Sequence, residues 1–183
     1  GGSDASVNKG LVAHWKFDGT AEDSTPNSND GTVTGAALST DRKSVSNKAY
    51  DFTAASNQKI TVSAATAVNN IFTTGGSLSF WMNADTTGEG AAGHMMEKDS
   101  GSVGWAIHMQ ATNELRFYHG WSGGTVFWTA SSAALTTGSW HHVVVTYDKD
   151  STANDPVVYV NGSSVTVGDQ TPSGTADDDS SAD

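Results

Sequence analysis

Residues 156–167 read Pro-Val-Val-Tyr-Val-Asn-Gly-Ser-Ser-Val-Thr-Val, with runs of β-branched residues on both sides of Asn161-Gly162. Asn-Gly is the strongest short signal for a β-hairpin, because both residues tolerate the positive φ angles of a type I′ turn. We therefore predict strands over 156–160 and 164–167, joined by a tight turn. Asn161-Gly162-Ser163 also matches the N-glycosylation sequon, but the tight turn is the simpler interpretation.

Outward from this hairpin, apolar and polar residues alternate along much of the chain. In 77–83, Leu78, Phe80 and Met82 fall on one face, as in a strand with one buried side. The same pattern predicts strands over 11–17, 50–52, 59–62, 104–110, 114–119, 125–130 and 140–147. One helical turn is expected within 64–72. The connections are too short for crossover helices, so we expect antiparallel strands packed as two sheets.

Composition excludes several classes of protein. The 183-residue chain carries 9 Lys and Arg against 20 Asp and Glu, a formal charge of −11. An acidic surface repels phosphate backbones, which argues against nucleic-acid binding. Apolar runs are only a few residues long, so no membrane-spanning segment is predicted. Cysteine is absent, which excludes disulfides, zinc–thiolate sites and thiol nucleophiles.

Six segments carry a family resemblance: 11–19 (Leu-Val-Ala-His-Trp-Lys-Phe-Asp-Gly), 29–32 (Asn-Asp-Gly-Thr), 48–52 (Lys-Ala-Tyr-Asp-Phe), 77–82 (Ser-Leu-Ser-Phe-Trp-Met), 140–148 (Trp-His-His-Val-Val-Val-Thr-Tyr-Asp) and 158–162 (Val-Tyr-Val-Asn-Gly). In this order they resemble the LamG-like (laminin G-like, pentraxin-like) domains of the concanavalin A-like lectin and glucanase superfamily. The resemblance implies an all-β fold, an antiparallel two-sheet jelly-roll sandwich of the concanavalin A-like type. One scaffold of this kind hosts many sites, so the resemblance constrains function less than fold.

The expected organisation is an N-terminal linker over 1–10, the sandwich over 11–168 and an acidic polar tail or loop over 169–183. The tail has no Val, Ile, Leu or aromatic residue, so we expect it to be disordered or a loop, with 177–183 as a solvated linker. Members of the family continue with closing strands beside the first strand. The resemblance therefore implies that such strands come from beyond Asp183 or from another chain, and that residues 1–183 alone fold poorly.

The loop that follows the first predicted strand contains the candidate metal ligands Asp18, Asp23, Asn29 and Asp30. Clustered carboxylate and amide oxygens suit Ca²⁺, and LamG-like domains often carry calcium at a rim, so calcium is the expected cofactor. The alternative is that these side chains bond their own backbone and shape turns.

The candidate glycan-binding residues are Tyr118, His119 and Trp121, in a stretch that continues with Ser122-Gly123-Gly124. A tryptophan among glycines, off the alternating pattern, can stack on the apolar face of a sugar ring while polar neighbours hold the hydroxyls. The alternative is a tryptophan that folds back to cover the end of the sandwich.

The sequence gives little sign of catalysis. The fold also houses glucanases, whose retaining members need two carboxylates about 5 Å apart, on a strand reading Glu-x-Asp-x-x-Glu. Glu97-Lys98-Asp99 is the nearest match, but Ser102 and Val103 stand where the third acid would be, and 99–101 reads as a turn. We therefore expect no enzymatic activity. His141 and His142 are adjacent on a strand and point to opposite faces, so they are not expected to share a metal.

The function predicted from these features is a non-catalytic carbohydrate-binding or adhesion module, extracellular or at a cell surface, with a glycan or surface polysaccharide as partner. The alternative is a structural surface protein, such as a virion decoration or fibre domain on the virion surface, which has other protein chains of a larger assembly as partners. A glucanase-related hydrolase is the weaker alternative.

Overall fold

The computed structural model describes residues 9–53, 56–63, 65–86, 92–131 and 134–182. These residues form twelve β-strands and two short 3-10 helices, and the strands pair antiparallel, which confirms the expected all-β class. The chain divides into two compact units, Gly1–Asn69 and Asn70–Asp183.

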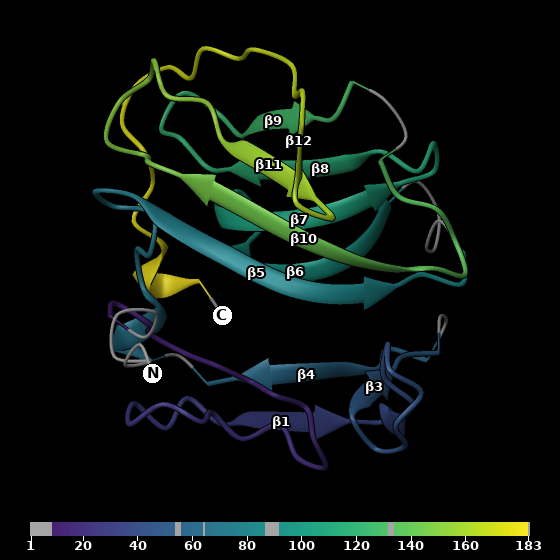
Figure 1. The fold of residues 1–183 in the computed structure, drawn as a ribbon. Coiled ribbons are helices and arrows are strands. Elements are labelled where there is room, and N and C mark those ends of the chain that lie inside the picture. Colours follow the sequence, from purple (N-terminus) through teal and green to yellow (C-terminus); the bar gives the residue numbers. More distant parts are fainter. Residues whose placement is uncertain (1–8, 54–55, 64, 87–91, 132–133, 183) are drawn as a thin grey trace, which may run out of the picture. The chain divides into compact units, whose positions relative to one another are not determined.

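Within the described residues, the second unit is built from two four-stranded sheets (Figure 1). The first sheet has the order β12-β11-β10-β5, with β5 (Gly76–Asn83), β10 (Trp140–Tyr147), β11 (Val157–Val160) and β12 (Ser163–Val165). The second has the order β6-β7-β8-β9, with β6 (Ala92–Ser100), β7 (Val103–Gln110), β8 (Leu115–His119) and β9 (Val126–Thr129). A short 3-10 helix, η3 (Asp179–Ser181), follows near the C-terminus.

The core lies between these two sheets, because alternate residues of each strand point inward. Ile107, Phe117 and Trp128 from one sheet and Val143 and Val158 from the other are fully buried and belong to one apolar cluster. Burial of each such side chain stabilises the fold by about 1.5–3 kcal/mol. The two-sheet sandwich predicted from period-two alternation is confirmed.

The hairpin predicted around Asn161-Gly162 is also confirmed. Asn161 and Gly162 have φ angles of 52° and 80°, and Val160 pairs with Ser163 across the turn between β11 and β12. Positive φ at both central positions is what a type I′ turn requires.

The first unit has two two-stranded sheets among its described residues, β1 (Gly31–Thr34) with β4 (Lys59–Val62) and β2 (Ala37–Ser39) with β3 (Ala49–Asp51). The helical turn expected within 64–72 is η2 (Thr66–Val68); residue 64 lies outside the described residues.

The predicted strand over 11–17 is wrong. Trp15 makes a single β-bridge, to Asp23, and Phe17 has a φ of 56°, which takes the backbone out of the extended region. Trp15 Nε1 also donates to the carbonyl of Asn29 at 2.7 Å. Burial does alternate along the segment, since Trp15 is half-buried and His14 is exposed. The segment, however, pairs with the following loop rather than with a strand.

Candidate functional site

The acid loop, residues 18–30, is organised by Asp23, whose side chain is buried. Its Oδ1 accepts from the backbone amides of His14 and Thr25, both at 2.9 Å. Its Oδ2 accepts from the Thr25 hydroxyl at 2.8 Å and from the backbone and side-chain amides of Asn29 at 3.0 Å. Asp23 therefore holds the loop together through donors that the loop itself supplies.

The other predicted calcium ligands take part in the same loop in different ways. Asp30 Oδ1 accepts from the Asp23 amide at 2.8 Å, while the exposed Asp18 lies 3.4 Å from Lys48 Nζ. These bonds match the alternative in which Asp and Asn side chains shape turns.

Electrostatics favour a charged Asp23. Burial on its own raises the pKa of this carboxyl, but hydrogen bonds from the amides of His14, Thr25 and Asn29 and from the Thr25 hydroxyl outweigh it. The pKa of Asp23 therefore lies well below its usual range, because these bonds stabilise the carboxylate.

The three predicted glycan-binding residues are all buried, with exposed fractions of 7% for Tyr118, 0% for His119 and 4% for Trp121. His119 contacts the rings of Phe72 and Tyr147, and Trp121 belongs to the core cluster. In this structure His119 and Trp121 offer no exposed ring to a sugar, which fits the alternative of a tryptophan that covers the end of the sandwich.

The C-terminal segment 169–182 is what covers Trp121. Trp121 forms a β-bridge with Ala176, and the Asp177 amide donates to the carbonyl of Gly120 at 3.0 Å. A Cβ on Gly120 would come within 2.5 Å of Asp177 Oδ2 and within 2.3 Å of the Ser102 carbonyl oxygen, so only glycine permits this approach. The segment is irregular, as expected, but it packs closely on the sandwich.

The expectation that 177–183 is solvated is wrong for the described residues, because polar bonds hold this segment. Asp179 is fully buried, and its carbonyl accepts from Lys98 Nζ at 2.7 Å. Lys149 Nζ donates to the Asp177 carbonyl, also at 2.7 Å. Both lysines are buried, so the segment is anchored without apolar side chains of large size.

The opposite side of the β6–β9 sheet carries the most site-like surface. Ladder pairing puts Ala106, Tyr118 and Phe127 in one row and His108, Arg116 and Thr129 in the next, while Trp128 and the other inward residues face the core. We call this surface the outer face. Its chemistry-bearing residues are His94, Glu97, Asp99, His108, Arg116, Tyr118 and Phe127.

The outer face has a buried floor and an exposed rim. His108 and Tyr118 are only 8% and 7% exposed, and their rings meet edge to face at 5.3 Å. Phe127 is 45% exposed beside Tyr118, and the side chains of His94 and Glu97 are 60% and 47% exposed. Such a surface can both contact a ligand and hold its own groups in place.

Polar bonds fix the floor and the rim. Burial, together with a hydrogen bond to Asp99, raises the pKa of the Tyr118 hydroxyl, which stays neutral. Arg116 Nε donates to the Thr129 hydroxyl at 3.0 Å, and its guanidinium lies 5.4 Å from the centre of the Phe127 ring. The charged and aromatic groups of the outer face are therefore pre-positioned by the sheet.

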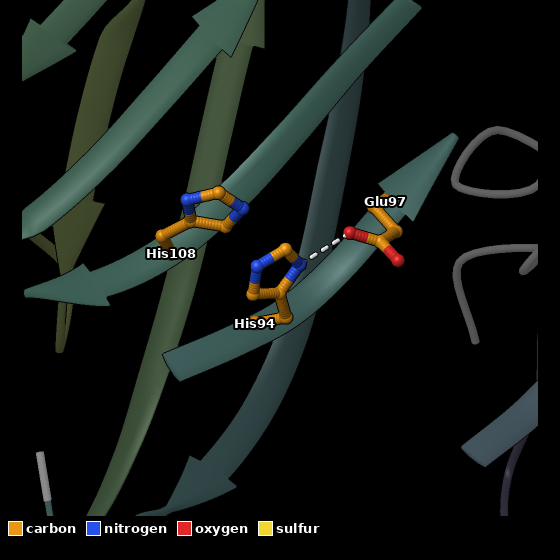
Figure 2. Close-up of side chains that lie close together, drawn as sticks. All are labelled: His94, Glu97 and His108. Carbon is orange, nitrogen blue, oxygen red and sulfur yellow. Dashed lines mark hydrogen bonds and ion pairs between the residues drawn. The ribbon is translucent and has the colours of Figure 1, made fainter. Parts of the chain in front are cut away.

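A β-bulge in β6 creates a further cluster on this face. The register shifts between His94 and Met96, so His94 lies opposite His108, whereas Glu97 lies opposite Ala106. His94, Glu97 and His108 thereby point toward one another (Figure 2), with potential ligand atoms within 4.8 Å of one another. The structure thus joins three residues that the sequence analysis did not connect.

A family model described as the concanavalin A-like lectin/glucanases superfamily, of laminin G type, matches residues 52–182, more than half of the chain. The chain belongs to the concanavalin A-like lectin and glucanase superfamily. Searches of curated proteins and of solved structures return no match.

Membership of this superfamily makes the carboxylates of β6 worth comparing with a glucanase motif. Residues 99–101 were expected to form a turn, but Asp99 lies within β6, on the same face as Glu97. The chain has Ser102 at the position of the third acid. The Glu-x-Asp pair is therefore on an exposed strand face, without the complete motif.

Of the helices that the described ranges contain, none is long and apolar enough to cross a membrane.

His141 is buried and bonded to Thr136, while His142 is half-buried and stacks on Trp81 at 5.1 Å, which confirms that the two point to opposite faces.

Proposed function

We propose that this chain is a non-catalytic carbohydrate-binding module whose ligand lies along the outer face of the β6–β9 sheet. The observation that carries the proposal is the half-exposed ring of Phe127, bordered by Arg116 and Tyr118 on a rigid sheet. Exposed aromatic rings stack on the apolar faces of sugar rings, and fixed polar groups around them select hydroxyl patterns.

The polar groups of the outer face suit a glycan. Arg116 supplies donors only, and Glu97 and Asp99 supply acceptors when ionised, so the face offers both to sugar hydroxyls. Because these groups stand on neighbouring strands of one sheet, they form an extended row rather than a deep pocket. The partner class is a glycan or surface polysaccharide, and such a module acts outside the cell or at its surface.

The proposal that the chain is not an enzyme rests on the incomplete acid motif. Glu97 and Asp99 share a face, but Ser102 cannot donate a proton to a leaving group as a carboxylic acid does. We expect no release of reducing sugar from β-glucans, and activity that Glu97→Gln abolishes would overturn this part of the proposal.

The binding proposal is tested on a glycan array, followed by calorimetric titration of the best oligosaccharide. Phe127→Ala is expected to weaken binding about two- to tenfold, in line with about 0.5–1.5 kcal/mol for one ring contact. Phe52→Ala is the matched control, because Phe52 is also an exposed phenylalanine, at 49% against 45%. Failure of the protein to bind any glycan, or equal losses in the two variants, would contradict the proposal.

A further inference from the structure

We propose that His94, Glu97 and His108 form a binding site for a divalent transition-metal ion of the zinc class. The proposal concerns the metal alone and does not rest on sugar binding at the same face. The three residues come from two paired strands, β6 and β7, which fix them on one side of the sheet.

The donor set and its geometry fit such an ion. Two imidazoles and one carboxylate can each offer one atom, and these atoms lie within 4.8 Å of one another (Figure 2). Imidazole suits zinc, copper and nickel, whereas calcium and magnesium prefer sites made of oxygen. Two histidines with one glutamate also form the ligand set of known zinc sites that leave a fourth position open.

His108 supplies a second, independent observation. Its side chain is more than nine-tenths buried, and within the described part of the chain its Nε2 has no hydrogen-bond partner. A buried polar atom without a partner costs roughly 1–3 kcal/mol, and a bound metal ion would supply the missing partner.

The bulge at Met95 is what makes the site possible. If the register of Glu97 opposite Ala106 continued without the shift, His94 would lie opposite Met109, whose side chain belongs to the core. The extra residue turns His94 to the outer face instead. Bulges are over-represented beside functional sites, where they re-aim a side chain.

The neighbouring groups are compatible with a bound cation. Nδ1 of His94 lies 2.5 Å from Oε2 of Glu97. The carboxylate therefore already faces the imidazole ring with which it would bind the metal ion. Asp99 lies on the same face. Arg116 pairs with His108 across β7 and β8, and its positive charge would repel a bound cation. Its guanidinium is held by a hydrogen bond to Thr129 and by contact with the Phe127 ring.

The site is tested by titrating the metal-free chain with Zn²⁺ in a calorimeter, and with Co²⁺ by visible absorption, without any glycan present. We expect one equivalent to bind, with the ligand-field bands of cobalt bound by nitrogen and oxygen. His94→Gln and Glu97→Gln should each weaken binding at least about tenfold, since loss of groups that merely support ligands already costs 10- to 100-fold.

Controls separate the site from surface binding and from misfolding. His14→Gln removes an exposed histidine of the first unit and should leave the affinity unchanged. Since His94 and Glu97 are rim residues, their variants should keep the circular dichroism and melting of the wild type, whereas His108→Gln changes a buried group. The proposal is overturned if no stoichiometric binding occurs, or if His14→Gln weakens it as much as His94→Gln.

Discussion

The acid loop of the first unit and the His94–Glu97–His108 cluster of the second both gather groups that can bind metals, but their atoms are employed differently. The carboxylate of Asp23 accepts bonds from His14, Thr25 and Asn29. By contrast, Nε2 of His108 is buried and, as far as the described residues reach, unbonded. The acceptor atoms of Asp23 are used to hold the loop in its own fold. In the cluster, Nε2 of His108 remains able to bind a metal ion.

This difference teaches that residue type alone does not identify a metal site. Asp and Asn are common in loops because they bond nearby backbone amides, and in that role they resemble a calcium site when only the sequence is known. By contrast, His94 is bonded to the side chain of Glu97, and, among the described residues, Nε2 of His108 is bonded to no group. The predictions below change one member of each group and ask whether stability or metal binding responds.

The largest expected effect is on the stability of the acid loop. Asp23→Ala removes the acceptor of buried donors, including both amides of Asn29. Unsatisfied buried donors cost about 1–3 kcal/mol each, so the loss of an acceptor for these two donors should lower the free energy of unfolding by about 2–6 kcal/mol. Urea denaturation followed by tryptophan fluorescence measures it.

Two variants sharpen this first test. Asp23→Asn keeps one oxygen acceptor and should lose less stability than Asp23→Ala. Glu97→Gln should leave the urea midpoint of the metal-free chain nearly unchanged, because that side chain is half exposed. Equal destabilisation by Glu97→Gln and Asp23→Ala would erase the distinction between a structural and a ligand-binding group.

The second effect concerns which ion stabilises the protein. At a free concentration 100 times its dissociation constant, an ion that binds only the folded state adds about 2.7 kcal/mol. We expect Zn²⁺ to raise the melting temperature accordingly and Ca²⁺ to leave it unchanged, since the acceptors of Asp23 are already used. A calcium-dependent rise that disappears in Asp23→Ala would instead support the calcium site expected from the sequence.

Much of the sandwich could be predicted because its strands obey period two. Strands 59–62 and 140–147 have the predicted bounds, since one face of each is more buried than the other. Strand β6 was missed for a physical reason. The bulge breaks the alternation, because Met95 and Met96 both pack against the core, and the charged Lys98 is buried. A search for strict alternation of apolar and polar residues does not detect a strand that contains an inserted residue.

The candidate site was less predictable than the fold. Glu97 and Asp99 were considered only as an incomplete glucanase motif, and Tyr118 was predicted to bind a glycan. Their common face depends on the β6–β8 register, which the sequence does not show. The link between His94 and His108 depends on the bulge, which only the paired strands reveal. The packing of 169–182 was missed because Lys98 and Lys149 anchor it through carbonyl groups, which composition does not report.

A smaller effect should appear as a pH dependence. In the folded protein the pKa of Asp23 is depressed below the ordinary value of 3.8. Its contribution to stability is therefore complete above the ordinary pKa and is lost as the pH falls toward the folded-state pKa. We expect the melting temperature to fall as the pH is lowered below about 4, and to fall less steeply in Asp23→Asn. Parallel curves for the two proteins would show that the carboxylate is not specially stabilised.

The smallest effect is expected at Asp18, which shares the loop and the predicted calcium role with Asp23 but not its surroundings. Its carboxylate lies 3.4 Å from Lys48 Nζ, and the side chains of Asp18 and Lys48 are 50% and 41% exposed. Exposed ion pairs contribute about 0–1 kcal/mol, because water and salt screen them and two long side chains must be ordered. A double-mutant cycle with Asp18→Asn and Lys48→Met should therefore give a coupling below about 1 kcal/mol that shrinks in high salt. A coupling comparable to the loss in Asp23→Ala would mean that both acids of the loop hold structure, and that burial is not what separates them.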